Sequence, residues 1–300
     1  MDGSRRAFLS TVGSVSAGST VLLAGCTGSG SDAAANAETT GESGGKAPET
    51  TSTDGVETTT SNGKGGISTT TIRDGTEQET TIYEIRSGKP GPTAFVEGGM
   101  HGNEESGYWA ADAIRKWDID AGTLVVLPEA NSQGVEHQRR KWPPGMDLNR
   151  QFPIGEPPKN ALATAIWNAI GEYDPDVFID LHSSKGILRR EGDEGVGQNV
   201  FRSKHDEIVR TVETAVERLN DGYVTGYDPI YDFVHTPVSE TKYAAEPMLV
   251  NKMRVDRDVP SCLFEVTQDD VKPEKRAQWT RVFVDSMLDS WNIRSSRLDG

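Results

Sequence analysis

The sequence has 300 residues, of which 46 are acidic and 31 are basic, so the formal net charge is −15. This balance excludes a nucleic-acid-binding protein, because contact with phosphates requires a basic surface. Together with the glycine content and the export signal below, it favours an origin in a halophilic archaeon, where surface carboxylates hold water in brine; ordinary solubility charge is the alternative.

Residues 1–25 resemble a signal peptide of the twin-arginine export route. Arg5 and Arg6 precede a mildly apolar run that Gly and Ser interrupt, and this run is too short and too polar for a transmembrane helix. The run ends in Leu-Ala-Gly-Cys, which resembles the lipobox of lipoproteins. We therefore expect export, lipidation of Cys26, and attachment to the outer face of the cell membrane.

Residues 26–66 consist mainly of Thr, Ser, Gly, Ala and acidic residues. Such a segment cannot bury enough apolar surface to offset its ordering entropy, so we expect a disordered stalk. Residues 67–300 remain for one catalytic domain with a sizeable core. The second of the two cysteines, Cys262, lies in an apolar run and is expected to be a core thiol, without a disulfide.

Strands and helices alternate along this domain. Residues 80–85 alternate in strand fashion and are expected to open the domain at a sheet edge. Apolar runs predict buried strands at 93–96, 124–127, 176–181 and 262–266, and helical spacing predicts helices at 105–117, 160–170, 205–219 and 275–291. The predicted fold class is α/β, with a mixed, largely parallel twisted sheet flanked by helices. Sites in such sheets form at the carboxyl ends of the strands.

Two histidines and a glutamate stand at these strand ends. His101 and Glu104 follow the first buried strand, three positions apart, and one turn of chain can bring both side chains to the same metal ion. The pair alone is a weak signal, because a helix N-terminus favours glutamate anyway. His182 follows the third buried strand. Two His and one Glu leave a fourth zinc position for water, which is the ligand count of a catalytic site.

Four motifs in this order resemble those of the zinc carboxypeptidase superfamily. They are His-Gly-Asn-Glu at 101–104, Asp-Leu-Asn-Arg-x-Phe-Pro at 147–153, Asp-Leu-His at 180–182 and Phe-Glu-Val-Thr at 264–267. The superfamily includes the carboxypeptidases and the succinylglutamate desuccinylase/aspartoacylase deacylases, and the motifs are most similar to those of the deacylases. The resemblance implies a zinc carboxypeptidase-like fold and one Zn²⁺ ion held by His101, Glu104 and His182.

The resemblance also implies roles for other residues. Glu265 would be the general base, and a carboxylate inside an apolar strand is costly unless it has such a role. Asn149 and Arg150 would bind the substrate's carboxylate. Arg139 or Arg140 would polarise the scissile carbonyl; the spacing does not decide between them, and Arg139 is slightly favoured.

Two further residues have roles by the same resemblance. Asp147 would accept a hydrogen bond from the free ring nitrogen of His101, with a helix or turn cap as the alternative. Tyr243 lies 22 residues before Glu265, about where carboxypeptidases carry a mobile substrate-covering tyrosine. A plain loop aromatic is the alternative for Tyr243. His137, His205 and His235 match no motif and are expected at the surface.

The leading hypothesis is a zinc-dependent deacylase that hydrolyses the amide bond of a small acylated amino acid. Many such deacylases have a β-rich C-terminal domain that narrows the pocket, and a single helix after Glu265 predicts a more open cleft. An extracellular zinc carboxypeptidase acting on peptides is therefore the alternative, and a non-catalytic surface-binding lipoprotein is the third possibility. The loop-rich stretches 185–198 and 221–246 are expected to line the substrate pocket.

Overall fold

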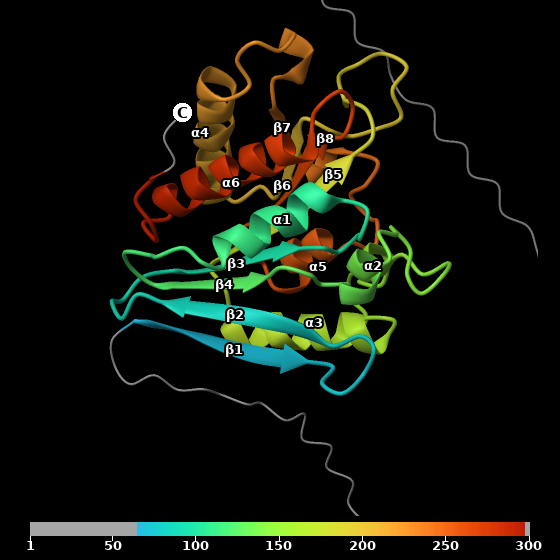
Figure 1. Ribbon diagram of the computed structural model, residues 1–300, viewed down its shortest axis with the longest axis vertical. Coiled ribbons are helices and arrows are strands. Elements are labelled where there is room, and N and C mark those ends of the chain that lie inside the picture. The colour runs from blue at the N-terminus through green and yellow to red at the C-terminus, as the bar shows by residue number, and fades with distance from the viewer. Residues whose placement is uncertain (1–64, 298–300) are drawn as a thin grey trace, which may run out of the picture. The chain divides into compact units, whose positions relative to one another are not determined.

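The computed structural model describes residues 65–297, which form one mixed sheet with helices on both faces (Figure 1). The predicted signal peptide, the lipidation site Cys26 and nearly all of the predicted stalk lie outside the described residues. No helix between residues 65 and 297 is long and apolar enough to cross a membrane. The strands of this part of the chain are β1 (Gly66–Ile72), β2 (Thr80–Arg86), β3 (Thr93–Gly98), β4 (Thr123–Leu127), β5 (Val177–Ser184), β6 (Asn199–Arg202), β7 (Val234–Pro237) and β8 (Ser261–Thr267).

The sheet has the strand order β1-β2-β4-β3-β5-β8-β6-β7. Its centre is parallel, because β3 pairs with β4 and β5, and β5 pairs with β8. The outer pairs β1–β2, β2–β4 and β6–β8 are antiparallel, whereas β6 and β7 are parallel. The predicted α/β class with a mixed, largely parallel sheet is confirmed.

The expectation that residues 80–85 open the domain at a sheet edge is wrong. Strand β1 precedes them, pairs with β2 along its whole length and takes the edge position, so β2 lies between β1 and β4. The sequence of β1 is Gly-Ile-Ser-Thr-Thr-Thr-Ile, and most of its residues are only half-buried. Thr favours strands but gives no apolar signal, which is why β1 escapes a search for apolar runs.

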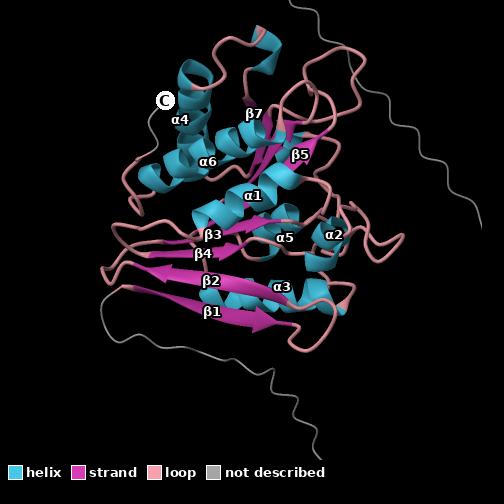
Figure 2. Cartoon of the chain, in the orientation of Figure 1, coloured by secondary structure: helices cyan, strands magenta, loops and turns pink. Residues whose placement is uncertain are grey.

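Helices cover both faces of the sheet (Figure 2). Helices α1, α4 and α6 share one hydrophobic core with the sheet, and Figure 1 shows α1 and α6 side by side across it. Helices α3 and α5 share a second core with the opposite face. The bounds are α1 (Glu105–Ile114), α2 (Ser132–Glu136), α3 (Ala161–Tyr173), α4 (Asp206–Gly222), α5 (Leu249–Asp256) and α6 (Pro273–Ser290).

Strand β3 shows why the central strands read as continuous apolar runs. Ala94 and Val96 point into the core beneath α1, and Phe95 points into the core beneath α3. Side chains alternate between the faces of a strand, so a strand covered on both faces needs apolar residues at every position. Charged residues in these strands therefore stand out.

The parallel strands at the centre of the sheet bring the candidate site residues together. Strands β3, β5 and β8 point the same way, so their carboxyl ends lie at one edge of the sheet. His101 follows β3, whereas His182 and Glu265 lie within the last residues of β5 and β8 and are register partners. Residues far apart in sequence meet here because of strand order alone.

Close packing of α1 on β5 holds this edge in place. A Cβ added at Gly107 of α1 would lie 2.4 Å from the carbonyl oxygen of Leu181, which is backbone and cannot rotate away. We therefore predict that Gly107→Ala destabilises the fold by about 1–3 kcal/mol through overpacking. The control is Gly222→Ala at the end of α4, where an added Cβ meets nothing within 4 Å. Thermal unfolding should show a lower midpoint for Gly107→Ala alone; equal midpoints would contradict this packing.

Candidate metal centre and active site

The turn between β3 and α1 presents His101 and Glu104. Gly99 has a φ of +73°, in the left-handed region that favours glycine. A Cβ at Gly102 would lie 1.7 Å from the carbonyl oxygen of Gly134, so the turn packs directly on the backbone of α2. Glu104 is the N-cap residue of α1, and its backbone N–H donates to the carbonyl of His101 at 3.2 Å. The glycines thus allow a tight turn whose two functional side chains face β5.

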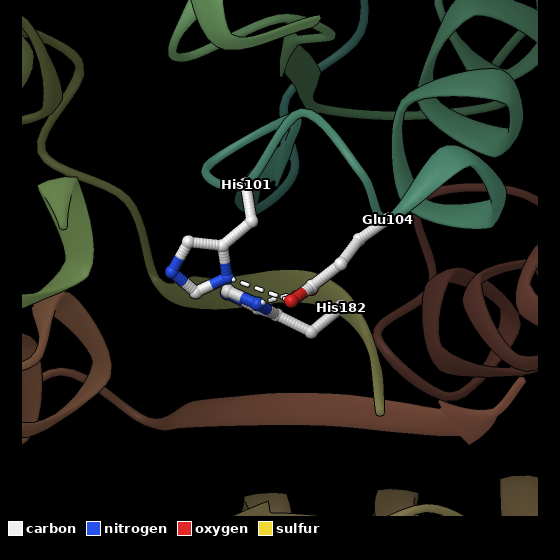
Figure 3. Close-up of side chains that lie close together, drawn as sticks. All are labelled: His101, Glu104 and His182. Carbon is white, nitrogen blue, oxygen red and sulfur yellow. Dashed lines mark hydrogen bonds and ion pairs between the residues drawn. The ribbon is translucent and has the colours of Figure 1, made fainter. Parts of the chain in front are cut away.

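His101, Glu104 and His182 converge in a solvent-excluded cluster (Figure 3). The Nδ1 atom of His101 lies 2.8 Å from Oε1 of Glu104, and the Nδ1 atom of His182 lies 2.8 Å from Oε2. The three side chains are at most 3% exposed, and their ligand atoms lie within 4.8 Å of one another. Two imidazole nitrogens and a carboxylate are a donor set that zinc prefers.

The far nitrogen of each imidazole faces a carboxylate. Nε2 of His101 lies 3.0 Å from Oδ1 of Asp147, and Nε2 of His182 lies 3.0 Å from Oδ1 of Asp180. Metal-binding histidines usually have such a partner, which fixes the tautomer and leaves the other nitrogen for the metal. The outer carboxylates and the inward Nδ1 atoms therefore fit a metal ion at this position.

The pKa values of the side chains in this cluster depend on the pairing of imidazoles with carboxylates. Burial acts to raise the pKa of Glu104, but His101 and His182 hold it well below its usual value. Burial acts to lower the pKa of His182, yet Asp180 and Glu104 raise it. For Asp147 the effect of burial is outweighed by the hydrogen bond with His101 and by the charges of Arg140 and Arg150, so its pKa falls. These interactions favour the ionised forms of Glu104 and Asp147.

A second carboxyl, Glu97, lies behind this cluster, and the sequence motifs do not mark it. Glu97 of β3 and Asp180 of β5 are register partners, and both are 0% exposed. Neither oxygen of Glu97 has a hydrogen-bond partner among the described residues. Burial, followed by the neighbouring Asp180 charge, raises the pKa of Glu97 well above its usual value. Two adjacent buried carboxyls disfavour a second negative charge, and this favours the neutral form of Glu97 over its ionised form.

The structure places the two candidate oxyanion residues differently. The Nη1 atom of Arg140 donates to Oε1 of Glu104 at 2.8 Å, its Nε lies 3.3 Å from Oδ2 of Asp147, and its side chain lines the pocket. Arg139 is exposed and outside the pocket lining, where its carbonyl accepts a hydrogen bond from the backbone of Gly102. This placement favours Arg140 as the oxyanion residue, whereas the sequence alone slightly favoured Arg139.

Asn149 and Arg150 lie close to the same cluster. They belong to a short 3₁₀ helix, Leu148–Arg150, and both line the pocket. Nδ2 of Asn149 approaches Nε2 of His182 at 3.5 Å, and its Oδ1 accepts from the backbone N–H of Leu249 at 3.0 Å. Arg150 is one-third exposed and pairs with Glu246 at 3.3 Å. The guanidinium of Arg150 is thus accessible from the pocket.

Glu265 projects from β8 into the same pocket. Its side chain is half-buried, and its Oε2 atom has no hydrogen-bond partner among the described residues. Burial raises the pKa of Glu265 to about 8, with Glu104 and Asp180 adding to the rise and His182 and Arg140 opposing it. A carboxyl with an unused oxygen and a pKa near neutrality can exchange protons with a substrate.

These residues surround one pocket of about 740 Å³. Of the two stretches expected to line it, 185–198 contributes Lys185, Gly186 and residues 192–196, whereas 221–246 contributes only Tyr243. The stretch 221–246 contains β7 and two 3₁₀ turns, so it is not a single long loop. Tyr243 packs its ring against Phe201 with centroids 5.8 Å apart.

Gln268 is a further pocket residue that no motif indicated. Its Nε2 donates to Oγ of Ser183 at 2.9 Å and to the carbonyl of Asn103 at 3.4 Å. It therefore joins the ends of β8 and β5 to the metal-binding turn. Its position two residues beyond Val266 on an apolar strand was the only available signal.

The other singled-out side chains lie outside the pocket lining. His137 is exposed, and His205 and His235 are half-buried. Cys262 is a free, fully buried thiol in β8, and burial raises its pKa. It therefore packs in the core, as its apolar surroundings in the sequence predicted.

Comparison with known proteins supports the resemblance that the four motifs indicate. The model of the succinylglutamate desuccinylase/aspartoacylase catalytic domain matches residues 90–187, which contain three of the four motifs. The N-alpha-acetyl-L-2,4-diaminobutyric acid deacetylase of Halomonas elongata is 33% identical over 110 residues, covering 33% of this chain and 30% of that protein. The chain thus matches less than a third of the length of this curated relative.

Solved structures agree on the fold. Product-bound Cell Shape Determinant protein Csd4 from Helicobacter pylori has a TM-score of 0.60 at 15% identity, covering 73% of this chain and 57% of Csd4. An aspartoacylase family protein from Mesorhizobium loti has a TM-score of 0.55 at 17% identity, covering 81% of this chain and 73% of that protein. The chain has a zinc carboxypeptidase-like fold. Within the chain, residues 90–187 are similar to the catalytic domain of the succinylglutamate desuccinylase/aspartoacylase family.

The buried carboxyl pair leads to a testable expectation. Because burial beside Asp180 favours the neutral form of Glu97, Glu97→Gln should preserve the size and polarity of the side chain, with an unfolding midpoint near that of the wild type. Glu97→Leu removes the polar group beside the buried carboxylate of Asp180, at a cost of about 1–3 kcal/mol. Thermal unfolding and zinc titration of both variants measure this. If Gln were as damaging as Leu, Glu97 would have to be ionised in the native state.

Proposed function

We propose that this protein is a zinc-dependent hydrolase that cleaves the amide bond of an acylated amino acid and releases the free amino acid. The observation that carries the proposal is the convergence of His101, Glu104 and His182 at a pocket into which Glu265 also projects. The match of residues 90–187 to the succinylglutamate desuccinylase/aspartoacylase catalytic domain and the similarity to a deacetylase support this reaction class.

The proposed metal ligands are Nδ1 of His101, the carboxylate of Glu104 and Nδ1 of His182. A zinc ion bound there supplies Lewis acidity, which activates water near neutral pH and polarises the scissile carbonyl. Asp147 and Asp180 hold the two imidazole rings in orientation from behind. Arg140 now contacts both Glu104 and Asp147, so its guanidinium lies at the rim of this cluster.

Glu265 is the proposed general base. Its unpartnered Oε2 atom can accept a proton from the attacking water. The protonated carboxyl can then pass this proton to the amide nitrogen as the C–N bond breaks, so that a neutral amine leaves. A pKa near neutrality suits both steps, because the group must gain and lose the same proton in each turnover.

The two arginines have separate proposed tasks. Arg140, beside the metal ligands, donates to the carbonyl oxygen as negative charge develops on it. Arg150, with Asn149, binds the carboxylate of the amino-acid part, since a guanidinium matches a carboxylate bidentately. Tyr243 lies at the pocket lining, where it can cover a bound substrate.

Carboxypeptidase action on peptides is a second candidate function, and the volume of the pocket supports it. A pocket of about 740 Å³ suits a ligand larger than an N-acetyl amino acid. Csd4 of Helicobacter pylori, which shares the fold, is described as a D,L-carboxypeptidase. Either reaction requires an amide beside a free carboxylate, so the same residues would serve both.

We also propose that the protein acts outside the cell, exported by the twin-arginine route and anchored to the membrane by a lipid on Cys26. The support is the sequence pattern at residues 1–26 alone. At that location the protein would meet peptides and envelope material rather than metabolic intermediates.

Assays on the full chain with one equivalent of zinc in high salt distinguish the candidates. Chelator-sensitive release of acyl groups from N-acyl amino acids supports the deacylase, and release of C-terminal residues from dipeptides supports the carboxypeptidase. Stoichiometric zinc binding without turnover of either substrate would contradict both and leave a non-catalytic surface-binding protein.

Glu265→Gln should keep zinc binding and lose turnover by several orders of magnitude, of which proton transfer alone supplies about 10²–10⁴-fold. The amide keeps the size of the side chain but cannot take the proton. Zinc content by atomic absorption and kcat on the best substrate measure the two effects separately. Near-normal rates in the variant would remove Glu265 from the mechanism.

The adjacent arginines provide a matched pair. Arg140→Ala should lower kcat by about 10²–10³-fold, because it removes an oxyanion donor. Arg139→Ala, which removes an equal charge one residue away and outside the pocket, should leave kcat within about twofold. Zinc titration of both variants controls for the contact of Arg140 with Glu104. Equal losses in the two variants, or a larger loss for Arg139, would contradict the proposed role.

A further inference from the structure

The pocket lining contains two chemically different sets of residues. One set, called here the apolar wall, consists of Val196, Phe201, Tyr243, Met248, Val250 and Leu263, which pack together as one hydrophobic cluster. The other set carries charged groups from the segments that follow β5 and β8, among them Lys185 and Asp269. The apolar wall can therefore receive a different part of a substrate than the charged groups do.

The apolar wall begins beside the proposed base. Leu263 is two residues before Glu265 on β8, so both side chains point to the same face of the sheet. Phe201 of β6 is the register partner of Leu263. Leu263 and Phe201 are 4% and 5% exposed. An apolar substrate group lying on this pair is therefore next to the amide that Glu265 serves.

The apolar wall also adjoins the carboxylate-binding residues. The backbone of Leu249 donates to Asn149 at 3.0 Å, and Glu246 pairs with Arg150 at 3.3 Å. The segment that contributes Met248 and Val250 to the wall therefore runs directly along Asn149 and Arg150. In an amino acid the carboxylate and the side chain share one carbon atom. The group that meets the wall is thus the side chain of the amino acid whose carboxylate Arg150 holds.

We infer that the apolar wall is the subsite for a large aliphatic or aromatic side chain on the amino acid that carries the substrate's free carboxylate. This inference rests on the proposed function. A charged side chain would lose its hydration against the wall. Lys242 lies 5.1 Å from the ring centroid of Tyr243, but it is exposed and is not part of the lining of the catalytic pocket. The exposed Glu194, at the rim beside Val196 and Tyr243, further disfavours acidic side chains.

A substrate series with one acyl group tests the subsite. For the zinc-loaded protein, kcat/KM with N-acetyl-L-leucine or N-acetyl-L-phenylalanine should exceed that with N-acetyl-L-aspartate by about 100-fold or more. N-acetyl-L-2,4-diaminobutyrate, whose side chain ends in an amine, should also be a poor substrate. If the activity is that of a carboxypeptidase, dipeptides with the same C-terminal residues replace this series. An equal or higher rate with aspartate or diaminobutyrate would overturn the inference.

Variants locate the effect on the wall. Met248→Arg and Leu263→Arg each add a cation to the wall and should lower the leucine-to-aspartate ratio by about tenfold or more. Val255→Arg adds the same charge at a 46% exposed position of α5, outside the pocket, and should leave the ratio unchanged. If Leu263→Arg fails to fold, Met248→Arg decides the question. A ratio that the folded wall variants leave unchanged would show that the wall does not select the side chain.

Binding separates failure of this inference from failure of the proposed function. Zinc-loaded Glu265→Gln should bind free L-leucine more tightly than free L-aspartate in calorimetry, even if no acylated substrate is hydrolysed by the wild type. Turnover of aspartate derivatives at a rate equal to or above that of leucine derivatives would contradict the subsite and keep the hydrolase. Absence of all turnover with preferential leucine binding would contradict the hydrolase and keep the subsite.

Discussion

The carboxylate of Glu104 is held in a place from which water is almost excluded, with the residue 3% exposed. Its Oε1 atom lies 2.8 Å from both Nδ1 of His101 and Nη1 of Arg140, and its Oε2 atom lies 2.8 Å from Nδ1 of His182 and 3.0 Å from the backbone nitrogen of Ser183. An ionised carboxylate can be buried only if such partners compensate it. The rest of the site can be understood as the set of partners that this one buried charge requires.

The sheet supplies these partners from separate parts of the chain. The β3–α1 turn carries His101, β5 carries His182, and the segment after α2 carries Arg140. Their meeting depends on parallel strands whose carboxyl ends share one edge, and on glycine at Gly102 and Gly107, where backbone approaches backbone. Two further carboxylates lie behind the rings: Asp147 is hydrogen-bonded to His101, and Asp180 lies 3.0 Å from Nε2 of His182. The fold alone thus brings the proposed metal ligands together.

The central strands and several candidate site residues could be predicted from the sequence, because each is marked by a pattern of neighbouring residues. Apolar runs located the buried central strands, and motifs at their ends located His101, Glu104, His182 and Glu265. Strand β1 was missed because threonine-rich edges have no apolar pattern. The choice between Arg139 and Arg140 and the partnership of Glu97 with Asp180 depend on which segments become neighbours in space. The spacing of residues along the chain does not encode which segments become neighbours. The same holds for the apolar wall, to which β6, β8 and the segment around the start of α5 contribute.

The central claim is that His101, Glu104 and His182 together form a zinc site. X-ray absorption spectroscopy of the protein loaded with one equivalent of zinc tests it most directly. The account predicts a first shell of nitrogen and oxygen only, at about 2.0–2.1 Å, with the outer-shell scattering of two imidazoles. A sulfur scatterer at about 2.3 Å, which would require a cysteine ligand, or scattering from fewer than two imidazoles would contradict it.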